Sequence, residues 1–502
     1  MMDLASSPFA TNSESLEIQT LLELPTSRLK EQELRNEQSA LLFISDLVSP
    51  IRKLPIEILQ EIFIACLPTA HNPVSSRWEP PILLTQICSS WRIIAHATPQ
   101  LWKSIHIRVD FPCGADRHSE ALQEWLTRSV AYPLNISVGA VDHWETGDLD
   151  EFYDNIIDTL IQFSERWREV YFAAPYQSLV PIISLPPSKV PLLESLSLDC
   201  LHQPPPGLAQ INFTLREPQS ICGVLKAPNL RDLSLLGCWQ IHLNEDVTRL
   251  NWSQLTNIVL EGTSYLGECY LSVSGTYKIL SLCRNLITLK LEISRITGHI
   301  EELPLDTTTA LISLPFLTKL SVRENTSLKR LFSLLHLPSL NFIEFRTTIY
   351  PTEQSSTSLL SLLTRFHNTI HLITNQLFIR QDFIKCLRLC PLLKSLSIRK
   401  AYTPRDIPSC KVDDAFLKLF FESSNDEGAL CPHLEDFEGS SVTAFSETTL
   451  LQFVREKNGD NSAGLAKLKR LYITANSSPL RDIHHELEPY KQAGLAASIV
   501  VY

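Results

Sequence analysis

The feature that most constrains the fold of this 502-residue chain is a short apolar pattern that returns many times. Two residues separate the first and second apolar positions and one separates the second and third, as in Leu193–Leu196–Leu198 and Leu286–Leu289–Leu291. Further copies begin at residues 167, 230, 255, 317, 340, 393 and 468, with weaker ones at 367 and 434. Repeats with periods of about 20 to 50 residues indicate a solenoid or a repeat array.

The residues around each copy predict alternating strands and helices. Proline stands two residues before the first apolar position of six copies, where it suits the start of a strand. Helical stretches lie between the copies, at 276–285, 382–390, 413–421 and 447–456, and the chain ends with a helix-like and then a strand-like segment. Strand, turn and helix in repetition build a parallel sheet with helices on one side. We therefore predict an irregular α/β solenoid over residues 105–502.

Composition narrows the classes of partner and the compartment. The net charge of −11 argues against nucleic acid or an anionic membrane as the main partner. Only 15 glycines are present, against about 35 for average usage, which disfavours nucleotide-binding and hydrolase folds. The 12 cysteines form no CxxC pair, and we expect neither a signal peptide nor a membrane span. We expect reduced thiols and a cytoplasmic or nuclear protein.

The N-terminal part divides into three segments. Residues 1–26 are rich in Ser, Thr and Glu and are expected to be disordered. Residues 27–49 have the apolar spacing of an amphipathic helix. Residues 50–104 predict a small all-α domain, with one helix in 51–68 that starts at Pro55 and another over 82–98.

Three motifs occur in order within this small domain. They read Leu54-Pro55-x-Glu57-Ile58-Leu59-x-x-Ile62-Phe63, then Ile87-Cys88-x-x-Trp91-Arg92-x-Ile94-Ala95, then Pro99-x-Leu101-Trp102. Residues 51–105 thereby resemble the F-box family in its divergent, F-box-like form. The spacing agrees except in the loop 68–81, which is longer than in a compact F-box. Residues 105–502 look like the degenerate leucine-rich repeats that often follow an F-box, with the last consensus position filled by Cys238, Asn325 and Asn476.

The resemblance implies a function and a set of contact residues. In this family the F-box docks onto the Skp-type linker subunit of a cullin-RING ubiquitin ligase, and the repeats bind a substrate protein. Three short helices cannot bury all of their apolar residues internally, so part of this surface is expected to meet a partner. The predicted contact residues are Leu54, Pro55, Ile58, Leu59, Ile62 and Trp91. For Trp91, a place in the core between helices is an equally good interpretation.

Several residues with potential chemistry have simpler explanations. The chain contains no GxSxG, GxxxxGK[ST], HExxH or GxGxxG motif, and we predict a protein that is not an enzyme and uses no cofactor or metal. His367 and His371 lie in a strand-like stretch. Cys386 and Cys390 are expected to be core thiols, and Asp413 is expected to start a helix.

Two questions remain open at the level of sequence. The basic residues beside the strand motifs either line a ligand-binding surface or belong to an ordinary solvated sheet face. These residues are Arg231, Lys290, Lys319, Arg323 and Arg399. The alternative to a ligase adaptor is a protein-interaction scaffold of the same architecture, which the long 68–81 loop favours.

Overall fold

The computed structural model forms two compact units. It describes residues 51, 54–109, 115–139, 150–201, 223–237, 250–262, 271–293, 310–349, 357–400, 410, 412–422, 428–440, 443–444, 446–459, 464–475 and 483–501. The helical unit comprises the described residues up to Pro68 together with Ser76–Leu101. The repeat unit comprises Thr69–Ser75 and the described residues from Trp102 onward. The predictions for 1–26 and 27–49, and Cys238 and Asn476, lie outside the described residues.

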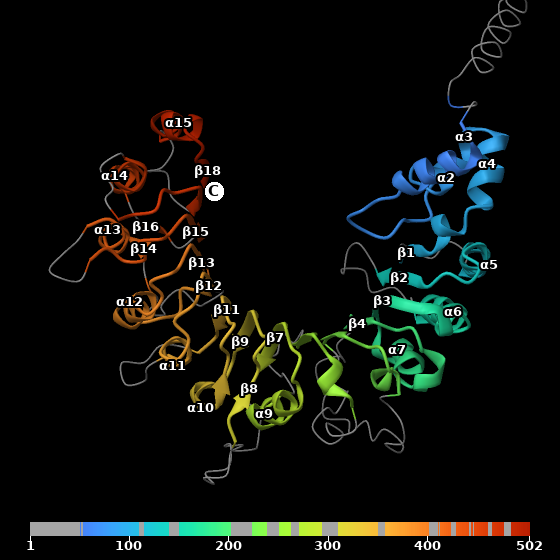
Figure 1. Cartoon of the computed structure of the whole chain (residues 1–502), viewed down its shortest axis with the longest axis horizontal. Helices are drawn as coiled ribbons and strands as arrows, with labels where there is room; N and C mark the ends of the chain where they lie inside the picture. The colour runs from blue at the N-terminus through green and yellow to red at the C-terminus, as the bar shows by residue number, and fades with distance from the viewer. Residues whose placement is uncertain are drawn as a thin grey trace, which may run out of the picture. The chain divides into compact units, whose positions relative to one another are not determined.

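The repeat unit is built on one sheet of 14 strands that follow one another in chain order, each parallel to its neighbours (Figure 1). The strands are β1 (Ser104–Arg108), β2 (Leu134–Gly139), β3 (Trp167–Ala174), β4 (Ser195–Cys200), β5 (Asp232–Leu236), β6 (Asn257–Glu261), β7 (Thr288–Ile293), β9 (Lys319–Glu324), β11 (Phe342–Thr347), β12 (His371–Asn375), β13 (Ser395–Arg399), β15 (Asp436–Ser440), β17 (Arg470–Ala475) and β18 (Ala496–Val501). The predicted parallel sheet is confirmed, and each copy of the apolar pattern coincides with a strand. Strand β2 was not predicted, because it is marked by alternation alone and the leading position of the pattern holds the small residue Ala131.

The apolar pattern works by alternation within each strand. In β4, Leu196 and Leu198 are fully buried, whereas Ser195 and Ser197 face the other side and stay half-buried. Successive side chains of a strand point to opposite faces, so the second and third positions of each copy fill the core. The opposite face of the sheet carries the polar positions, and we call it the open face.

The first position of each copy anchors the turn that leads into the strand. Leu230, for example, is buried, and its successor Arg231 donates its N–H to the Glu194 carbonyl oxygen at 2.8 Å. The Thr256 N–H then donates to the Arg231 carbonyl oxygen at 2.8 Å, and the Ile287 N–H donates to Thr256 at 2.8 Å. Backbone hydrogen bonds thus link each turn to the preceding one before the strands begin to pair.

The helices of the repeat unit lie along the other side of the sheet (Figure 1). They are α5 (Ala115–Arg128), α6 (Asp150–Ile161), α7 (Tyr176–Ile183), α9 (Val273–Leu282), α10 (Lys329–Ser333), α11 (Ser358–Leu363), α12 (Arg380–Arg388), α13 (Asp414–Lys418), α14 (Glu447–Asn458) and α15 (His484–Gln492). The four helical stretches predicted between copies are found, with shifted ends. Helix α9 begins earlier than predicted because the Ser272 hydroxyl accepts the Gly275 N–H at 2.9 Å and caps it.

Short elements complete the connections. They are the 3-10 turns η2 (Pro99–Trp102), η3 (Ser164–Arg166), η4 (Pro187–Lys189), η5 (Val224–Lys226) and η7 (Trp252–Gln254), and the paired strands β8 (Ile312–Ser313) with β10 (Leu335–His336) and β14 (Val412–Asp413) with β16 (Thr443–Ala444). No helix among the described residues is long and apolar enough to cross a membrane.

A chain of phenylalanine rings fills the core between sheet and helices in the later repeats. Phe345 on β11 lies 6.3 Å from Phe378, and Phe378 stacks on Phe383 of α12 at 5.4 Å between ring centroids. Phe383 stacks in turn on Phe416 of α13 at 5.8 Å, and Phe420 lies 5.6 Å beyond. Each ring therefore packs against rings of its own and the next repeat, which couples neighbouring units.

The helical unit contains α2 (Ile56–Ala65), α3 (Ile82–Ile87) and α4 (Ser89–His96). The prediction of one helix over 82–98 was wrong. At Cys88 the backbone is extended, with φ −157° and ψ 170°, and the chain turns. The Cys88 sulfur accepts the Trp91 N–H at 3.5 Å, and the Arg92 Nε donates to the Thr85 carbonyl oxygen at 2.8 Å. These side-chain contacts satisfy backbone groups at the break, so two short helices form instead of one.

Candidate protein-interaction surfaces

Helix α2 positions most of the predicted contact residues. Pro55 occupies the position before its first turn, where a missing N–H costs nothing. Leu59 and Phe63, one turn apart, face the core of the helical unit and are buried. The remaining apolar residues of α2 are left on other faces of the helix.

The structure separates the six predicted contact residues into three groups. Leu54, Pro55 and Ile58 are exposed, with fractional exposures of 36% for Leu54 and 47% for Ile58. Ile62 and Trp91 are half-buried. Leu59 is only 6% exposed, so it packs in the core of the helical unit and cannot contact a partner directly. The Trp91 ring lies 4.7 Å from the Phe63 ring, so this residue takes part in the core while one side remains accessible.

Three further isoleucines are exposed on the same unit. They are Ile56 on α2, Ile87 on α3 and Ile93 on α4. Ile87 begins the second of the three sequence motifs and is the last residue of α3, directly before the break at Cys88. Isolated apolar residues on a surface are normal, but several large ones on one small unit indicate an interaction surface.

The loop between α2 and α3 has a role within the repeat unit. Val74 pairs with His106 of β1, and the His106 N–H donates to the Pro73 carbonyl oxygen at 2.7 Å. The Asn72 side-chain amide donates to the Ser137 hydroxyl of β2 at 3.1 Å. Strand β1 is the first strand of the sheet, and covering an edge strand protects its unpaired backbone groups. The long loop that favoured a scaffold function thus has a structural explanation.

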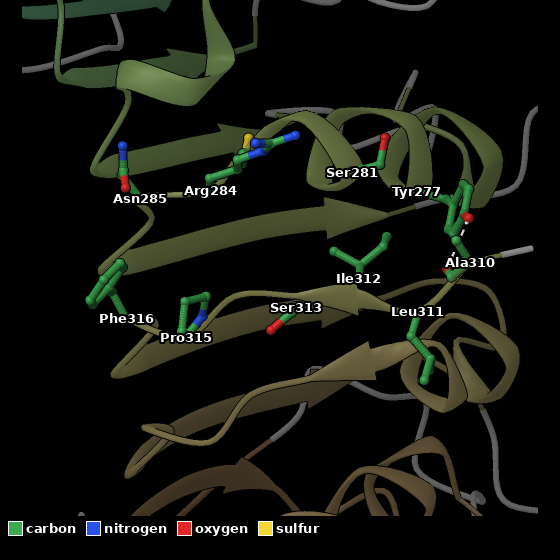
Figure 2. Close-up of a pocket in the computed structure, with 11 residues that line it drawn as sticks. Tyr277, Ser281, Arg284, Asn285, Ala310, Leu311, Ile312, Ser313, Pro315 and Phe316 are labelled. Atoms are coloured by element: carbon green, nitrogen blue, oxygen red, sulfur yellow. Dashed lines mark hydrogen bonds between the residues drawn. The ribbon is translucent and has the colours of Figure 1, made fainter.

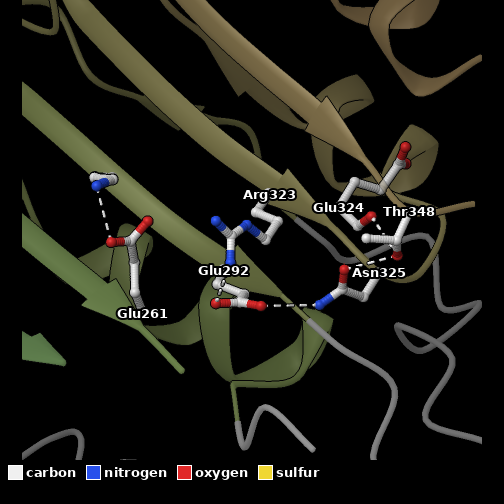
Figure 3. Close-up of polar contacts among 7 residues, drawn as sticks. Glu261, Glu292, Arg323, Glu324, Asn325 and Thr348 are labelled. Atoms are coloured by element: carbon white, nitrogen blue, oxygen red, sulfur yellow. Dashed lines mark hydrogen bonds and ion pairs between the residues drawn. The ribbon is translucent and has the colours of Figure 1, made fainter. Parts of the chain in front are cut away.

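The open face of the sheet carries charged residues in cross-strand pairs. Lys290 of β7 pairs with Glu261 of β6 at 2.8 Å, and Arg323 of β9 pairs with Glu292 of β7 at 3.5 Å. Figure 3 shows the Arg323–Glu292 pair and the Asn325 side chain, which donates to the other oxygen of Glu292 at 3.2 Å. Four of the five basic residues named from sequence therefore lie on strands of the sheet, and Lys290 and Arg323 are held in ion pairs.

Other basic residues on this face are also fixed. Arg399 of β13 pairs with Glu438 of β15 at 3.4 Å. The Lys319 ammonium lies over the Phe342 ring, 4.7 Å from its centroid, in a cation–π interaction. Arg231 lies in the turn before β5 and contributes through its backbone.

Buried carboxylates lie at the carboxyl ends of the middle strands. Burial raises the pKa of Glu292, which the Arg323 guanidinium and the Asn325 amide oppose. Burial likewise raises the pKa of Glu324, although its carboxylate accepts the Leu328 N–H at 3.2 Å. Thr348 joins the next strand to this network, because its hydroxyl donates to the Asn325 side-chain oxygen at 2.8 Å (Figure 3). Asn325, the consensus-type residue, thus ties three neighbouring strands together.

No family model matches the chain, and no curated protein matches it. Among solved structures, the chain is similar to one from the crystal structure of the Rad7 and Elc1 complex in yeast. The match has a TM-score of 0.36 and 13% sequence identity, and it covers 87% of this chain and 95% of the other. Similarity at this level assigns neither a family nor a function.

Cysteine and aspartate residues that were considered for metal or redox chemistry have structural roles in the repeat unit. Cys386 and Cys390 are buried on and just after α12, and burial raises the pKa of each thiol to about 12. Asp413 caps α13, because its carboxylate accepts the Phe416 N–H at 2.9 Å, as the sequence predicted. Among the described residues, no group of three or more His, Cys, Asp or Glu side chains is placed to hold a metal ion.

A shallow hollow lies beside α9, as Figure 2 shows. Its volume is about 480 Å³, and its lining includes Ser281, Arg284 and Asn285 on one side and Leu311 and Phe316 on the other. Leu311 and Phe316 are both exposed, so the hollow is open. The Tyr277 hydroxyl donates to the Ala310 carbonyl oxygen at 3.1 Å and joins the two sides. Nothing in this arrangement converges on a reacting group.

Proposed function

We propose that this chain is the substrate-recognition adaptor of a Skp-cullin-F-box type ubiquitin ligase. The helical unit binds a Skp-type linker subunit and through it a cullin, and the repeat unit binds a substrate protein. In this proposal the chain carries no catalytic residue, because ubiquitin transfer belongs to other subunits. The ligase works in the cytoplasm or nucleus, where the chain is expected to be found.

The observation that carries the proposal is the exposure of Leu54, Pro55 and Ile58 at the start of α2. These residues belong to the motif that resembles an F-box, and they lie outside the core that Leu59 and Phe63 form. Their neighbours Ile56 and Ile62 add apolar area to the same helix. A helix that presents apolar residues to solvent is suited to packing against a partner helix or groove.

The experiment that tests the proposal is co-purification of the full chain with a Skp-type linker subunit. The variant Leu54→Ala/Ile58→Ala removes two exposed side chains without opening the core, so we expect it to fold normally. Truncating one central anchor typically costs about 2 kcal/mol, roughly 30-fold in affinity. We expect the double variant to lose at least that much.

The matched control is Leu192→Ala/Leu392→Ala, which truncates two exposed leucines of the repeat unit. This control should bind the linker as the unchanged chain does. If the unchanged chain does not bind the linker, the adaptor function is wrong and a scaffold outside the ligase takes its place. Equal losses in both variants would show that the helical unit is not the contact.

A further inference from the structure

We propose that the open face of the repeat unit binds an acidic, Asp/Glu-rich segment of a partner protein. The segment crosses strands β9 to β13, where the strand register places three arginines in a row across the sheet. They are Arg323, Arg346 and Arg399, which we call the arginine row. That the partner is a ligase substrate rests on the proposed function; the binding of an acidic segment does not.

The first observation is which member of each ion pair faces solvent. The cation is the more exposed partner in all five pairs whose acid lies on β6, β7, β11 or β15; in the pair Arg470–Asp436 the cation is 70% exposed and the acid 18%. The exposed side-chain fractions of cation and acid are 42% and 18% for Lys290–Glu261, 42% and 8% for Arg323–Glu292, 38% and 16% for Arg346–Glu344, and 40% and 31% for Arg399–Glu438. The acids form a lower layer and the cations an outer layer, so a partner meets positive charge first.

This layering is not a general property of ion pairs on the chain. On α5, Arg128 is 23% exposed while its partner Glu124 is 66% exposed. On α15, Lys491 is 30% exposed while Glu488 is 55% exposed.

On strand β3 the acid Glu169 is likewise more exposed, at 51%, than its partner Arg168, at 38%. On α12 the order is reversed, since Lys385 is 62% exposed and Asp382 is 17% exposed. Cations that face outward in every pair are therefore a feature of the sheet from β6 onward. They appear on a chain with a net charge of −11, whose overall charge repels anions.

The second observation is that two of the arginines occupy opposite positions on neighbouring strands. Arg323 of β9 is opposite Arg346 of β11 in the parallel register. Like charges at opposite positions of neighbouring strands destabilise a sheet, and an anion bound between them relieves the repulsion. Each guanidinium also keeps donors that its own carboxylate partner does not use, because a guanidinium carries five.

The geometry favours carboxylates spread along a segment over one phosphate. Arg399 is opposite Asn375, so the arginine row spans three strand spacings from β9 to β13. Three spacings amount to about 14 Å, which an extended peptide covers in about four residues. Recognition of a single phosphate uses a convergent arginine cluster, whereas a row suits successive acidic side chains.

Fluorescence anisotropy with the full chain tests this proposal. The probe is a labelled Glu-rich peptide of about twelve residues, long enough to cross the row. We expect it to bind, with an affinity that falls as salt is added, while the same peptide with Gln for Glu does not bind. The variant Arg323→Gln/Arg346→Gln/Arg399→Gln should bind the Glu-rich peptide about tenfold or more weakly.

A control variant with the same charge change separates the row from net charge. Lys226→Gln/Arg365→Gln/Lys385→Gln replaces three exposed cations that lie outside the strands of the sheet. It should bind the peptide within about twofold of the unchanged chain. Absence of binding by the unchanged chain, or equal losses in the two variants, would overturn the proposal.

Two further probes test the class of ligand. A phosphoserine peptide that binds about tenfold more tightly than the Glu-rich peptide would overturn the assignment to carboxylates. A single-stranded DNA oligonucleotide that binds more tightly, and loses affinity in the row variant, would replace a protein segment with nucleic acid.

Linker binding measured on the same samples keeps this inference apart from the proposed function. Both triple variants should bind the Skp-type linker unchanged, which also shows that they are folded. Peptide binding without linker binding would sink the adaptor function and leave the acidic-segment site standing. Linker binding without peptide binding would overturn the acidic-segment site and leave the adaptor function standing.

Discussion

At the scale of single residues, burial controls the protonation of side chains in the repeat unit. Lys457 on α14 has a fully buried side chain, and its ammonium donates to the Pro432 carbonyl oxygen at 3.3 Å. Burial lowers the pKa of Lys457 from 10.5 to about 8. The unfolded chain therefore binds this proton more tightly than the folded chain does.

Lys457 should make the free energy of unfolding rise with pH in the alkaline range. Between pH 8 and pH 10.5 the unfolded chain holds the proton that the folded chain has released, so this residue's contribution to stability rises with pH. Below pH 8 its burial carries the full cost, about 3 kcal/mol from the size of the shift. We expect Lys457→Met to raise the melting temperature at neutral pH, with a gain that shrinks towards pH 10. A melting temperature lowered by Lys457→Met at neutral pH would contradict this account.

Burial should also set the reactivity of the cysteines. Burial raises the pKa of Cys283, Cys386 and Cys390 to about 12 each, whereas Cys66 is exposed. The thiolate is the reactive form, so native-state alkylation at neutral pH should label Cys66 and spare the three buried thiols until the chain unfolds. Mass spectrometry of the labelled peptides measures this. Early labelling of Cys386 or Cys390 would show that the later repeats open readily.

At the scale of elements, the chain of phenylalanine rings couples the helices of the later repeats, in addition to the strand pairing of the sheet. Phe383 and Phe416 stack with an angle of 7° between their planes and connect α12 to α13. Both are fully buried. Because each repeat touches only its neighbours, a cavity here should act locally.

We expect Phe416→Ala to lower the free energy of unfolding by about 3 to 5 kcal/mol. Hydrogen exchange should rise most in β12 to β15 and least in β2 to β4, which lie many strands away in the sheet. Phe316→Ala is the control, since Phe316 is exposed and its loss should cost less than about 0.5 kcal/mol. Exchange that rises equally along the whole sheet would mean that the repeat unit unfolds as one block.

At the scale of the whole molecule, the parallel sheet was predictable because one apolar pattern marks almost every strand. Strand β2 was missed because Leu134, Ile136 and Val138 alternate without a large apolar residue at the leading position, which is Ala131. The exposure of the contact residues was not predictable from spacing. Ile58 and Leu59 are adjacent and both apolar, and only the packing of α2 shows that Leu59 is buried and Ile58 exposed.

The arginine row could be anticipated only in part for a related reason. The sequence shows that Arg323 and Arg399 lie beside strand motifs, but not which residues are opposite one another. Register depends on the turn lengths between strands, which vary in this chain. The layering of acids beneath cations follows from that register, so it becomes visible only in three dimensions.

The central claim is that the helical unit binds a Skp-type linker subunit. Hydrogen exchange of the full chain, measured with and without saturating linker, tests this claim most directly. The account predicts slower exchange in residues 54–65 and in α4 when the linker is present, with the strands of the repeat unit unchanged. Slower exchange confined to the repeat unit, or no change anywhere, would contradict it.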